Sequence, residues 1–322
     1  MKVLLTGATG FVGREALRQL LAAGHGVRAV VRDPTRAPQD SSSAQGTDTP
    51  RRLIDAVYGN VLQPESLRGA AEGCDAVIHL VGIISEISEQ TFENVHLNAT
   101  NNVLAEAKRA RVKRWIQMSA LGTRPNAVSR YHQTKWSAEE SVRASGLDWT
   151  VLRPSLIYGP EDHFVNLFAG MARWTPVLPV MGNGESLLQP VSVENVCRCF
   201  VGALAEPRSI SQTMDVCGPD RLTFNQVLEA ILNAMGKRRL KVHLPLSLGR
   251  IQAALLETIF PILLRKAAPL NRDQLLMLQE DNVGDARPAE EMFNLTQARF
   301  AEDIRRYLQQ KAPCKQISQR AD

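Results

Sequence analysis

The sequence begins with a short apolar run that turns directly into a glycine-rich segment, KVLLTGATGFVG. Gly7, Gly10 and Gly13 stand between this run and a helical pattern over residues 11–23. Glycines at a strand-to-helix junction permit a tight turn, close approach of the backbone to a pyrophosphate and close packing of the helix on the strand. The position of the three glycines therefore predicts dinucleotide binding, although their spacing is one residue wider than Gly-x-Gly-x-x-Gly. Their neighbours are expected to belong to the same loop: Thr9, Phe11 and Val12.

Strand and helix patterns alternate over the first 153 residues. Six apolar runs predict strands, namely KVLLT, VRAVV, RLIDAVY, DAVIHLV, VKRWIQMS and DWTVLRP. Helical patterns separate the later runs at residues 64–71, 91–111 and 129–145, whereas residues 33–52 are polar and predict an exposed, mobile loop. Such alternation predicts an α/β fold in which helices cover both faces of a doubly wound parallel sheet, as in a Rossmann domain.

The pattern becomes irregular after residue 153. Helices are expected at residues 164–174, 194–204, 224–235, 246–264 and 297–309, separated by loops rich in glycine and proline. We therefore expect a Rossmann domain over residues 1–153, a smaller and mostly helical C-terminal cap over 154–310, and a flexible tail over 311–322. Segments near residues 190–217 are expected to return and add the last strands to the sheet.

Composition excludes several classes of protein. Hydrophobic residues make up 44% and charged residues 22% of the chain, as in soluble globular proteins. The five cysteines have no zinc-site spacing and predict reduced thiols, and the six histidines are scattered, so no metal site is expected. The longest apolar stretch, residues 251–264, contains Glu257 and Pro261 and is too short to span a membrane. These features, with no secretory leader expected, predict a cytoplasmic protein.

The end of the second predicted strand bears on the choice of dinucleotide. An acidic residue there accepts hydrogen bonds from the ribose of NAD, whereas a guanidinium suits the 2′-phosphate of NADP. The strand ends in Val31 and is followed by Arg32, with Arg36 further along the loop. NADP(H) is therefore favoured, and NAD(H) stays open because Asp33 would serve it if the register shifted by a residue.

Tyr131 and Lys135 are four residues apart in a predicted helix and therefore share one of its faces. A chance pair with this spacing has odds of roughly one in ten in a chain of this composition, so the pair needs a structural context. That context comes with the order TGATGFVG, Tyr131-x-x-x-Lys135 and VLRPSLIYGP. In these motifs the chain resembles the short-chain dehydrogenase/reductase superfamily, in its extended or atypical branch. It also resembles bacterial relatives of the NAD(P)H-binding accessory subunit of respiratory complex I, a group similar to NmrA-like redox sensors and to photosystem assembly factors.

The resemblance implies catalytic roles for three residues. Tyr131 would protonate a substrate carbonyl as hydride leaves the nicotinamide, Lys135 would lower the pKa of the phenol and hold the nicotinamide ribose, and Ser119 would hydrogen-bond the substrate oxygen. The asparagine common in the fourth helix of the extended enzymes is replaced by His96 or shifted to Asn98; we expect His96 to be a packed or hydrogen-bonded residue. The resemblance implies further cofactor contacts at Asn60, Val61, Leu80, Val81, Gly82, Pro154, Ser155, Leu156 and Ile157.

Three functions are consistent with these motifs. The first is an oxidoreductase that reduces a carbonyl or enone group of a small molecule or quinone. The second is a non-catalytic NAD(P)H-binding redox sensor, or an accessory or assembly protein of a respiratory complex. The third is a nucleotide-sugar epimerase or dehydratase, for which the cap lacks a clear set of pyrophosphate-binding arginines. No motif indicates nucleic-acid binding.

Residues 237–272 carry a net positive charge larger than that of the whole chain. The net charge of the whole chain is +5, and this window alone has eight basic residues against one acidic residue, Glu257. It predicts either a solvated lid over the substrate cleft or contact with an acidic partner, a respiratory complex or the inner membrane. The basic residues are Lys237, Arg238, Arg239, Lys241, Arg250, Arg265, Lys266 and Arg272.

Overall fold

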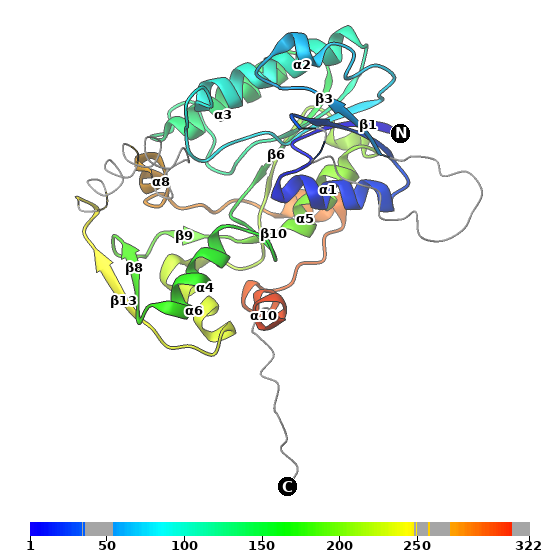
Figure 1. Ribbon diagram of the computed structural model, residues 1–322. Helices are drawn as coiled ribbons and strands as arrows, with labels where there is room; N and C mark the ends of the chain where they lie inside the picture. The colour runs from blue at the N-terminus through cyan, green and yellow to red at the C-terminus, as the bar shows by residue number, and fades with distance from the viewer. Residues whose placement is uncertain (34, 36–53, 248, 250–256, 258–270, 311–322) are drawn as a thin grey trace.

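A seven-stranded sheet forms the centre of the computed structural model, which describes residues 1–33, 35, 54–247, 249, 257 and 271–310 (Figure 1). Its strands run in the order β11-β6-β5-β4-β1-β2-β3, and every neighbouring pair is parallel. In chain order the strands are β1 (Lys2–Thr6), β2 (Gly26–Val31), β3 (Ile54–Tyr58), β4 (Ala76–His79), β5 (Arg114–Met118), β6 (Asp148–Pro154) and β11 (Gln212–Val216).

Helices cover both faces of this sheet (Figure 1). On one face lie α1 (Phe11–Ala22), α5 (Val193–Ala203) and α9 (Arg287–Phe293), and on the other lie α2 (Ala99–Arg109) and α3 (Arg130–Arg143). A hydrophobic core lies on each face of the sheet, and successive residues of β1 point into them alternately. Val3 and Leu5 pack toward α1, and Leu4 packs toward α2. Because both faces are buried, the strands read as continuous apolar runs rather than as alternating ones. The predicted α/β, doubly wound parallel fold is confirmed.

Two helical segments differ from the sequence prediction. Residues 64–71 were expected to form one helix, but only the short 3₁₀ helix η2 (Pro64–Leu67) forms. Residues 91–111 form a π-helix, η3 (Glu93–Asn98), which continues into α2. A π-turn inserts one residue into the helical ladder, and hydrophobic spacing alone does not reveal where that insertion falls.

The cap packs around a separate apolar core. Its helices α4 (Phe164–Trp174), α6 (Phe224–Ala234) and α10 (Phe300–Gln310) fall close to the predicted ranges, and a short helix, α8 (Arg272–Met277), precedes α9. The cap also contains strands that the sequence analysis did not predict. They pair as β8 (Val177–Met181) with β13 (Leu240–Leu244), β9 (Leu187–Leu188) with β12 (Leu222–Thr223), and β10 (Val191–Ser192) with β7 (Ile157–Tyr158).

Several predicted segments lie wholly or largely outside the described residues. They are the polar loop over 33–52 apart from Asp33 and Thr35, most of the helix expected at 246–264, and the tail over 311–322. Across the ranges that the structure does describe, none of the helices is both long and apolar enough to cross a bilayer.

Candidate cofactor and catalytic site

The glycine-rich loop connects β1 to α1 with a conformation that requires glycine. Gly7 has a φ of +80°, a region that other residues adopt only with strain. At Gly13 an added Cβ would lie 2.0 Å from the carbonyl oxygen of Gly7, so a side chain cannot fit between the helix and the loop. The first turn of α1 contains no acidic residue, and Gly10 at its N-cap has no side chain to cap it. Its N–H groups are therefore available to an anion such as a phosphate.

A cavity of about 240 Å³ lies beside this loop at the carboxyl ends of the central strands. In parallel α/β sheets, ligands bind at this edge. Nine of the predicted cofactor residues line the cavity: Gly7, Thr9, Gly10, Arg32, Asn60, Val61, Leu80, Val81 and Gly82. Sequence reasoning missed seven further lining residues: Val30, Val31, Gly59, Leu62, Ile83, Gln90 and Val95. Most of these are immediate neighbours of predicted residues, whereas Gln90 and Val95 come from the segment around η3 and carried no local signal.

The other predicted cofactor residues do not line this cavity. Phe11 and Val12 pack against the core between α1 and α5, and the Phe11 ring lies against Gly159. Ser155 is buried and its hydroxyl donates to the carbonyl of Gln189 at 2.6 Å. Pro154 is the last residue of β6, Leu156 follows that strand, and Ile157 begins β7. The contact expected between this segment and the nicotinamide stays a prediction.

Arg32 and Asp33 have different surroundings. Arg32 lines the cavity, whereas Asp33 does not. The carboxylate of Asp33 accepts hydrogen bonds from the backbone N–H and the hydroxyl of Thr35, at 2.9 and 2.6 Å. The acidic side chain that would select NAD is thus engaged in a local turn, and the guanidinium is the charged group at the cavity.

Tyr131 lies in the first turn of α3, surrounded by other rings. Phe92, His96 and His132 contact it edge-on, with centroid distances of 5.9, 5.1 and 5.2 Å. Burial raises the pKa of Tyr131 to about 12. This direction is opposite to the one expected from a neighbouring Lys135, because burial of the phenol is the cause of the shift.

The ammonium of Lys135 lies next to Gly82, which lines the cofactor cavity. Its side chain is only 2% exposed, and Nζ donates to the carbonyl of Met118 at 3.3 Å. A Cβ added at Gly82, which lines the cavity, would lie 3.0 Å from Nζ. Burial lowers the pKa of Lys135 to about 8, so the charged form is present at neutral pH at a cost in folding stability. The burial of the Lys135 charge can therefore be tested by measuring protein stability.

Replacing Lys135 with methionine is expected to stabilise the cofactor-free protein while weakening cofactor binding. Methionine fills a similar volume without a buried charge, and the depressed pKa corresponds to a gain on the order of 1–3 kcal/mol at pH 7. In the unfolded chain Lys135 stays protonated up to about pH 10.5, whereas in the folded protein it loses its proton near pH 8. The free energy of unfolding of the unmutated protein should therefore rise between about pH 8 and 10.5, and that of the variant should not. Thermal unfolding across this pH range checks both statements. Exposed Lys108→Met is the control, and a destabilised Lys135→Met protein would contradict the argument.

Ser119 follows β5 and its hydroxyl is already engaged. It donates to Oε1 of Glu139 at 2.5 Å, and Ser119 is 4% exposed. Glu139 is completely buried and also accepts hydrogen bonds from Arg153 at 2.9 and 2.6 Å and from Arg143 at 2.6 Å. To donate to a substrate oxygen as the resemblance implies, Ser119 would have to release this carboxylate. In the described structure, Ser119 contributes to a buried ion-pair network.

His96 lies in the π-helix η3 and faces Lys135, whereas Asn98 is exposed. His96 Nδ1 is 2.9 Å from the hydroxyl of Thr134, and Nε2 is within 3.2 Å of the backbone N and O of Ile83. Burial, followed by the charge of Lys135, holds the pKa of His96 well below its usual range, so the ring is neutral. His96 is therefore the packed, hydrogen-bonded residue that the sequence indicated, and π-turns of this kind often occur at functional sites.

A residue far along the chain holds the start of α3. The carboxylate of Asp273 accepts hydrogen bonds from the backbone N–H groups of Arg130 and Tyr131, at 3.1 and 2.7 Å. A carboxylate at a helix N-terminus is favourable because it meets unpaired N–H groups. Asp273 is thus a positioning residue for Tyr131, and it had no sequence signal.

A second cavity, of about 480 Å³, opens between this capping contact and the loop after β4. Arg130 and Arg272 lie in its wall, but each forms an ion pair, with Glu86 at 3.2 Å and Glu257 at 2.7 Å. The remaining lining residues are Ser85, Phe92, Asn271 and Asp273. Among the described lining residues, three carboxylates stand against two guanidiniums.

No group of three or more His, Cys, Asp or Glu side chains within the described ranges is arranged to hold a metal ion. The four described cysteines, Cys74, Cys197, Cys199 and Cys217, are buried free thiols.

Residues 7–167, which contain the glycine loop, the cavity lining and the Tyr131–Lys135 pair, match the family described as NAD(P)H-binding. The chain is also 31% identical over 246 residues to a ceramide reductase of Caulobacter vibrioides, covering 76% of this chain and 73% of the relative. The chain belongs to the NAD(P)H-binding family. This NAD(P)H-binding protein is 28% identical over 290 residues to subunit 9 of the NADH dehydrogenase 1 alpha subcomplex of Arabidopsis thaliana, covering 86% and 69% of the two chains.

Solved structures share the fold of this NAD(P)H-binding protein. The UDP-glucose 4-epimerase of Thermotoga maritima superposes with a TM-score of 0.72, covering 96% of this chain and 98% of that chain. The identity is only 19%, so this similarity concerns the fold alone. The relatives and the fold together confirm the resemblance to extended or atypical short-chain dehydrogenases/reductases.

Proposed function

We propose that this protein is an NADP(H)-dependent oxidoreductase that reduces a carbonyl or enone group of a small molecule or a quinone. The observation that supports it most strongly is the position of Lys135, whose ammonium borders Gly82 in the wall of the cofactor cavity. Tyr131 lies one helical turn before Lys135 on the same face of α3. A cofactor bound along the cavity would therefore bring its reactive ring toward a proton donor.

Different residues of the cavity would hold different groups of the cofactor. The first turn of α1 and the glycine loop suit the pyrophosphate, and Arg32 suits a 2′-phosphate because its guanidinium can form a charge-assisted hydrogen bond. Asn60, Val61 and the segment from Leu80 to Gly82 would enclose the adenosine and ribose groups. The bound nicotinamide supplies hydride, while Tyr131 supplies the proton to the substrate oxygen.

Arg32→Ala is expected to reduce NADPH affinity about tenfold or more and to leave NADH affinity nearly unchanged. Tenfold corresponds to about 1.4 kcal/mol for the lost pair with the 2′-phosphate. Fluorescence titration of both cofactors against both proteins measures the effect. Arg18→Ala removes an equal charge from α1 outside the cavity and serves as the control. Equal affinities for NADPH and NADH in the unmutated protein would refute the preference.

The activity itself is tested with a substrate panel. Purified protein is mixed with NADPH and with quinones, enones and aldehydes, and absorbance at the nicotinamide band reports oxidation. Oxidation that depends on one class of acceptor is the expected result. Bound NADPH that none of the panel oxidises would favour the second candidate function.

That second candidate is a non-catalytic NAD(P)H-binding redox sensor or a respiratory-complex accessory or assembly protein. Its support is the state of the catalytic side chains, because Ser119 is held by Glu139 and burial raises the pKa of Tyr131 to about 12. The similarity to a subunit of NADH dehydrogenase favours the same candidate. In that role the protein would be cytoplasmic or peripheral to the inner membrane, with contact through residues 237–272. Most of that window lies outside the described residues.

A nucleotide-sugar epimerase or dehydratase is the least favoured function, although such enzymes share the fold. A diphosphate needs uncompensated arginine or lysine side chains. The described cavity beside Tyr131 instead has two arginines that are already paired and an excess of carboxylates. A neutral or cationic polar group fits this wall better than a diphosphate.

A further inference from the structure

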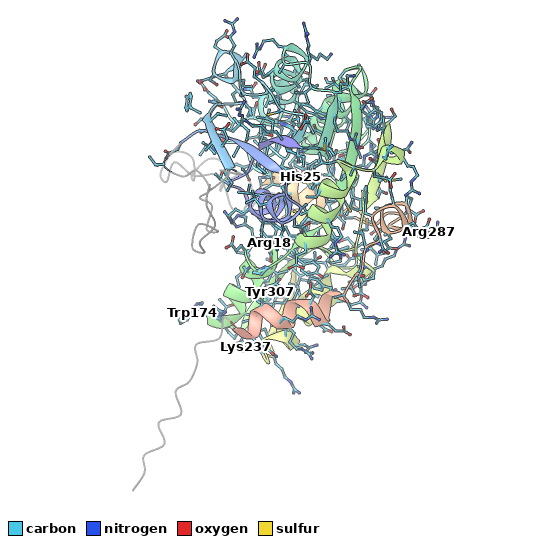
Figure 2. All side chains as sticks on the ribbon, turned by 90° about the vertical axis from the view of Figure 1, so that its right-hand side faces the viewer. Arg18, His25, Trp174, Lys237, Arg287 and Tyr307 are labelled. Atoms are coloured by element: carbon cyan, nitrogen blue, oxygen red, sulfur yellow. The ribbon has the colours of Figure 1, made fainter. Side chains whose placement is uncertain are left out.

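The far end of the cap exposes large apolar side chains next to basic ones. Trp174 is 88% exposed, Leu240 is 65% exposed and Leu167 is 50% exposed. Figure 2 shows Trp174 and Lys237 at this same end of the molecule. We call this surface the cap-tip patch, and it comprises Leu167, Arg173, Trp174, Pro176, Lys237, Arg238 and Leu240.

The residues of the cap-tip patch form one continuous surface. Leu167 and Trp174 are seven residues apart on α4 and therefore share a face of that helix. Leu240 begins β13, and its N–H donates to the carbonyl of Pro176 at 3.1 Å. The neighbouring Arg239 donates to the carbonyl of Ala172 at 2.9 Å, which fixes the basic segment beside the end of α4.

The positive charge of the cap-tip patch is not neutralised by nearby groups. Within the described part of the chain, Arg173, Lys237 and Arg238 form no ion pair, whereas Lys241 just beyond the patch pairs with Glu229 at 2.8 Å. An exposed tryptophan costs free energy in water because its large apolar ring stays hydrated. The cap-tip patch thus combines an apolar ring with uncompensated cations on a protruding end.

We propose that the cap-tip patch docks on the surface of an anionic lipid bilayer, with Trp174 entering the headgroup region and the basic side chains contacting lipid phosphates. Tryptophan favours the membrane–water interface, and lysine and arginine are attracted to anionic headgroups. Among the described residues of the cap-tip patch, three large apolar side chains are exposed, too few for the core of a standard protein interface, whereas a bilayer requires no complementary shape. This surface is distant in the fold from the cofactor cavity, so the proposal does not depend on catalysis.

Vesicle flotation with the full-length protein tests the proposal at low salt. Vesicles containing phosphatidylglycerol and phosphatidylcholine are compared with vesicles of phosphatidylcholine alone. We expect binding to the anionic vesicles that weakens as salt rises, because screening shortens the reach of the charges. The Arg173/Lys237/Arg238→Gln variant is expected to lose on the order of 100-fold in partitioning, and Trp174→Ala about tenfold.

A matched control separates the cap-tip patch from net charge. Lys108, Arg111 and Lys113 are exposed on the Rossmann domain, and their triple glutamine variant removes the same charge and should bind normally. Tryptophan emission should shift to the blue on anionic vesicles and fail to shift in Trp174→Phe. Of the other three tryptophans, Trp115 is buried, and Trp136 and Trp149 are partly buried against Arg143, outside the patch. Equal losses in the two triple variants, or an unchanged shift in Trp174→Phe, would overturn the proposal, as would the absence of binding at low salt.

Discussion

Replacing Glu139 with alanine is expected to lower the free energy of unfolding by about 3–5 kcal/mol. The carboxylate is completely buried and joins Arg153, Arg143 and the hydroxyl of Ser119. Without it, the guanidinium of Arg153 stays partly buried and loses the carboxylate to which it is hydrogen-bonded. Removing one partner of a buried pair costs much more than the pair itself contributes. Urea unfolding at pH 7, followed by circular dichroism, measures the change.

The next residue in the chain provides the control. Glu140 also pairs with Arg143, at 2.6 Å, but its side chain is 55% exposed. Glu140→Ala should therefore change the free energy of unfolding by less than about 1 kcal/mol, as is usual for surface ion pairs. If the two alanine variants were equally stable, the buried network would not be the stabilising element that the geometry indicates.

Tyr131→Phe is expected to reduce turnover of NADPH by about 10² or more while preserving cofactor affinity. The change removes only the phenolic oxygen and keeps the ring among Phe92, His96 and His132. Turnover is measured with the best acceptor from the substrate panel, and cofactor affinity by fluorescence titration. Tyr58→Phe removes the same oxygen from an exposed tyrosine and should change neither quantity. Full turnover in Tyr131→Phe would exclude this residue as the proton donor.

The pH dependence of the same reaction follows from the two side chains. With its pKa raised to about 12, Tyr131 remains protonated, and so able to donate, at every pH used for the assay. Lys135 has a pKa lowered to about 8, so its positive charge is lost as pH rises through that value. We therefore expect kcat/KM for reduction to be level below about pH 7 and to fall above pH 8, and a fall on the acid side only would contradict this assignment.

Local chemistry made the cofactor half of the site predictable. The backbone requires glycine at residue 7, where φ is positive, and at residue 13, where the helix packs against the loop. Both requirements are visible in the sequence as glycines. The parallel direction of the strands also follows from the alternation of strands and helices, because parallel strands need crossover connections. Lining residues such as Arg32, Asn60 and Gly82 come immediately after strands and share one edge of the sheet for that reason.

Contacts between distant segments were decided only by the tertiary structure. Ser119 is predicted to be a catalytic serine, yet its hydroxyl is bound to Glu139, which α3 places beside the residue that follows β5. Asp273 caps α3 from 142 residues further along the chain, and β13 joins β8 across more than 60 residues. The spacing of residues predicts which segments form helices or strands and where they end. The partner that a side chain contacts depends instead on how whole helices and strands pack together. The sequence thus determined the fold and the kind of cofactor loop that this protein has. Packing decided which hydroxyl, carboxylate and ammonium groups are already hydrogen-bonded within the protein.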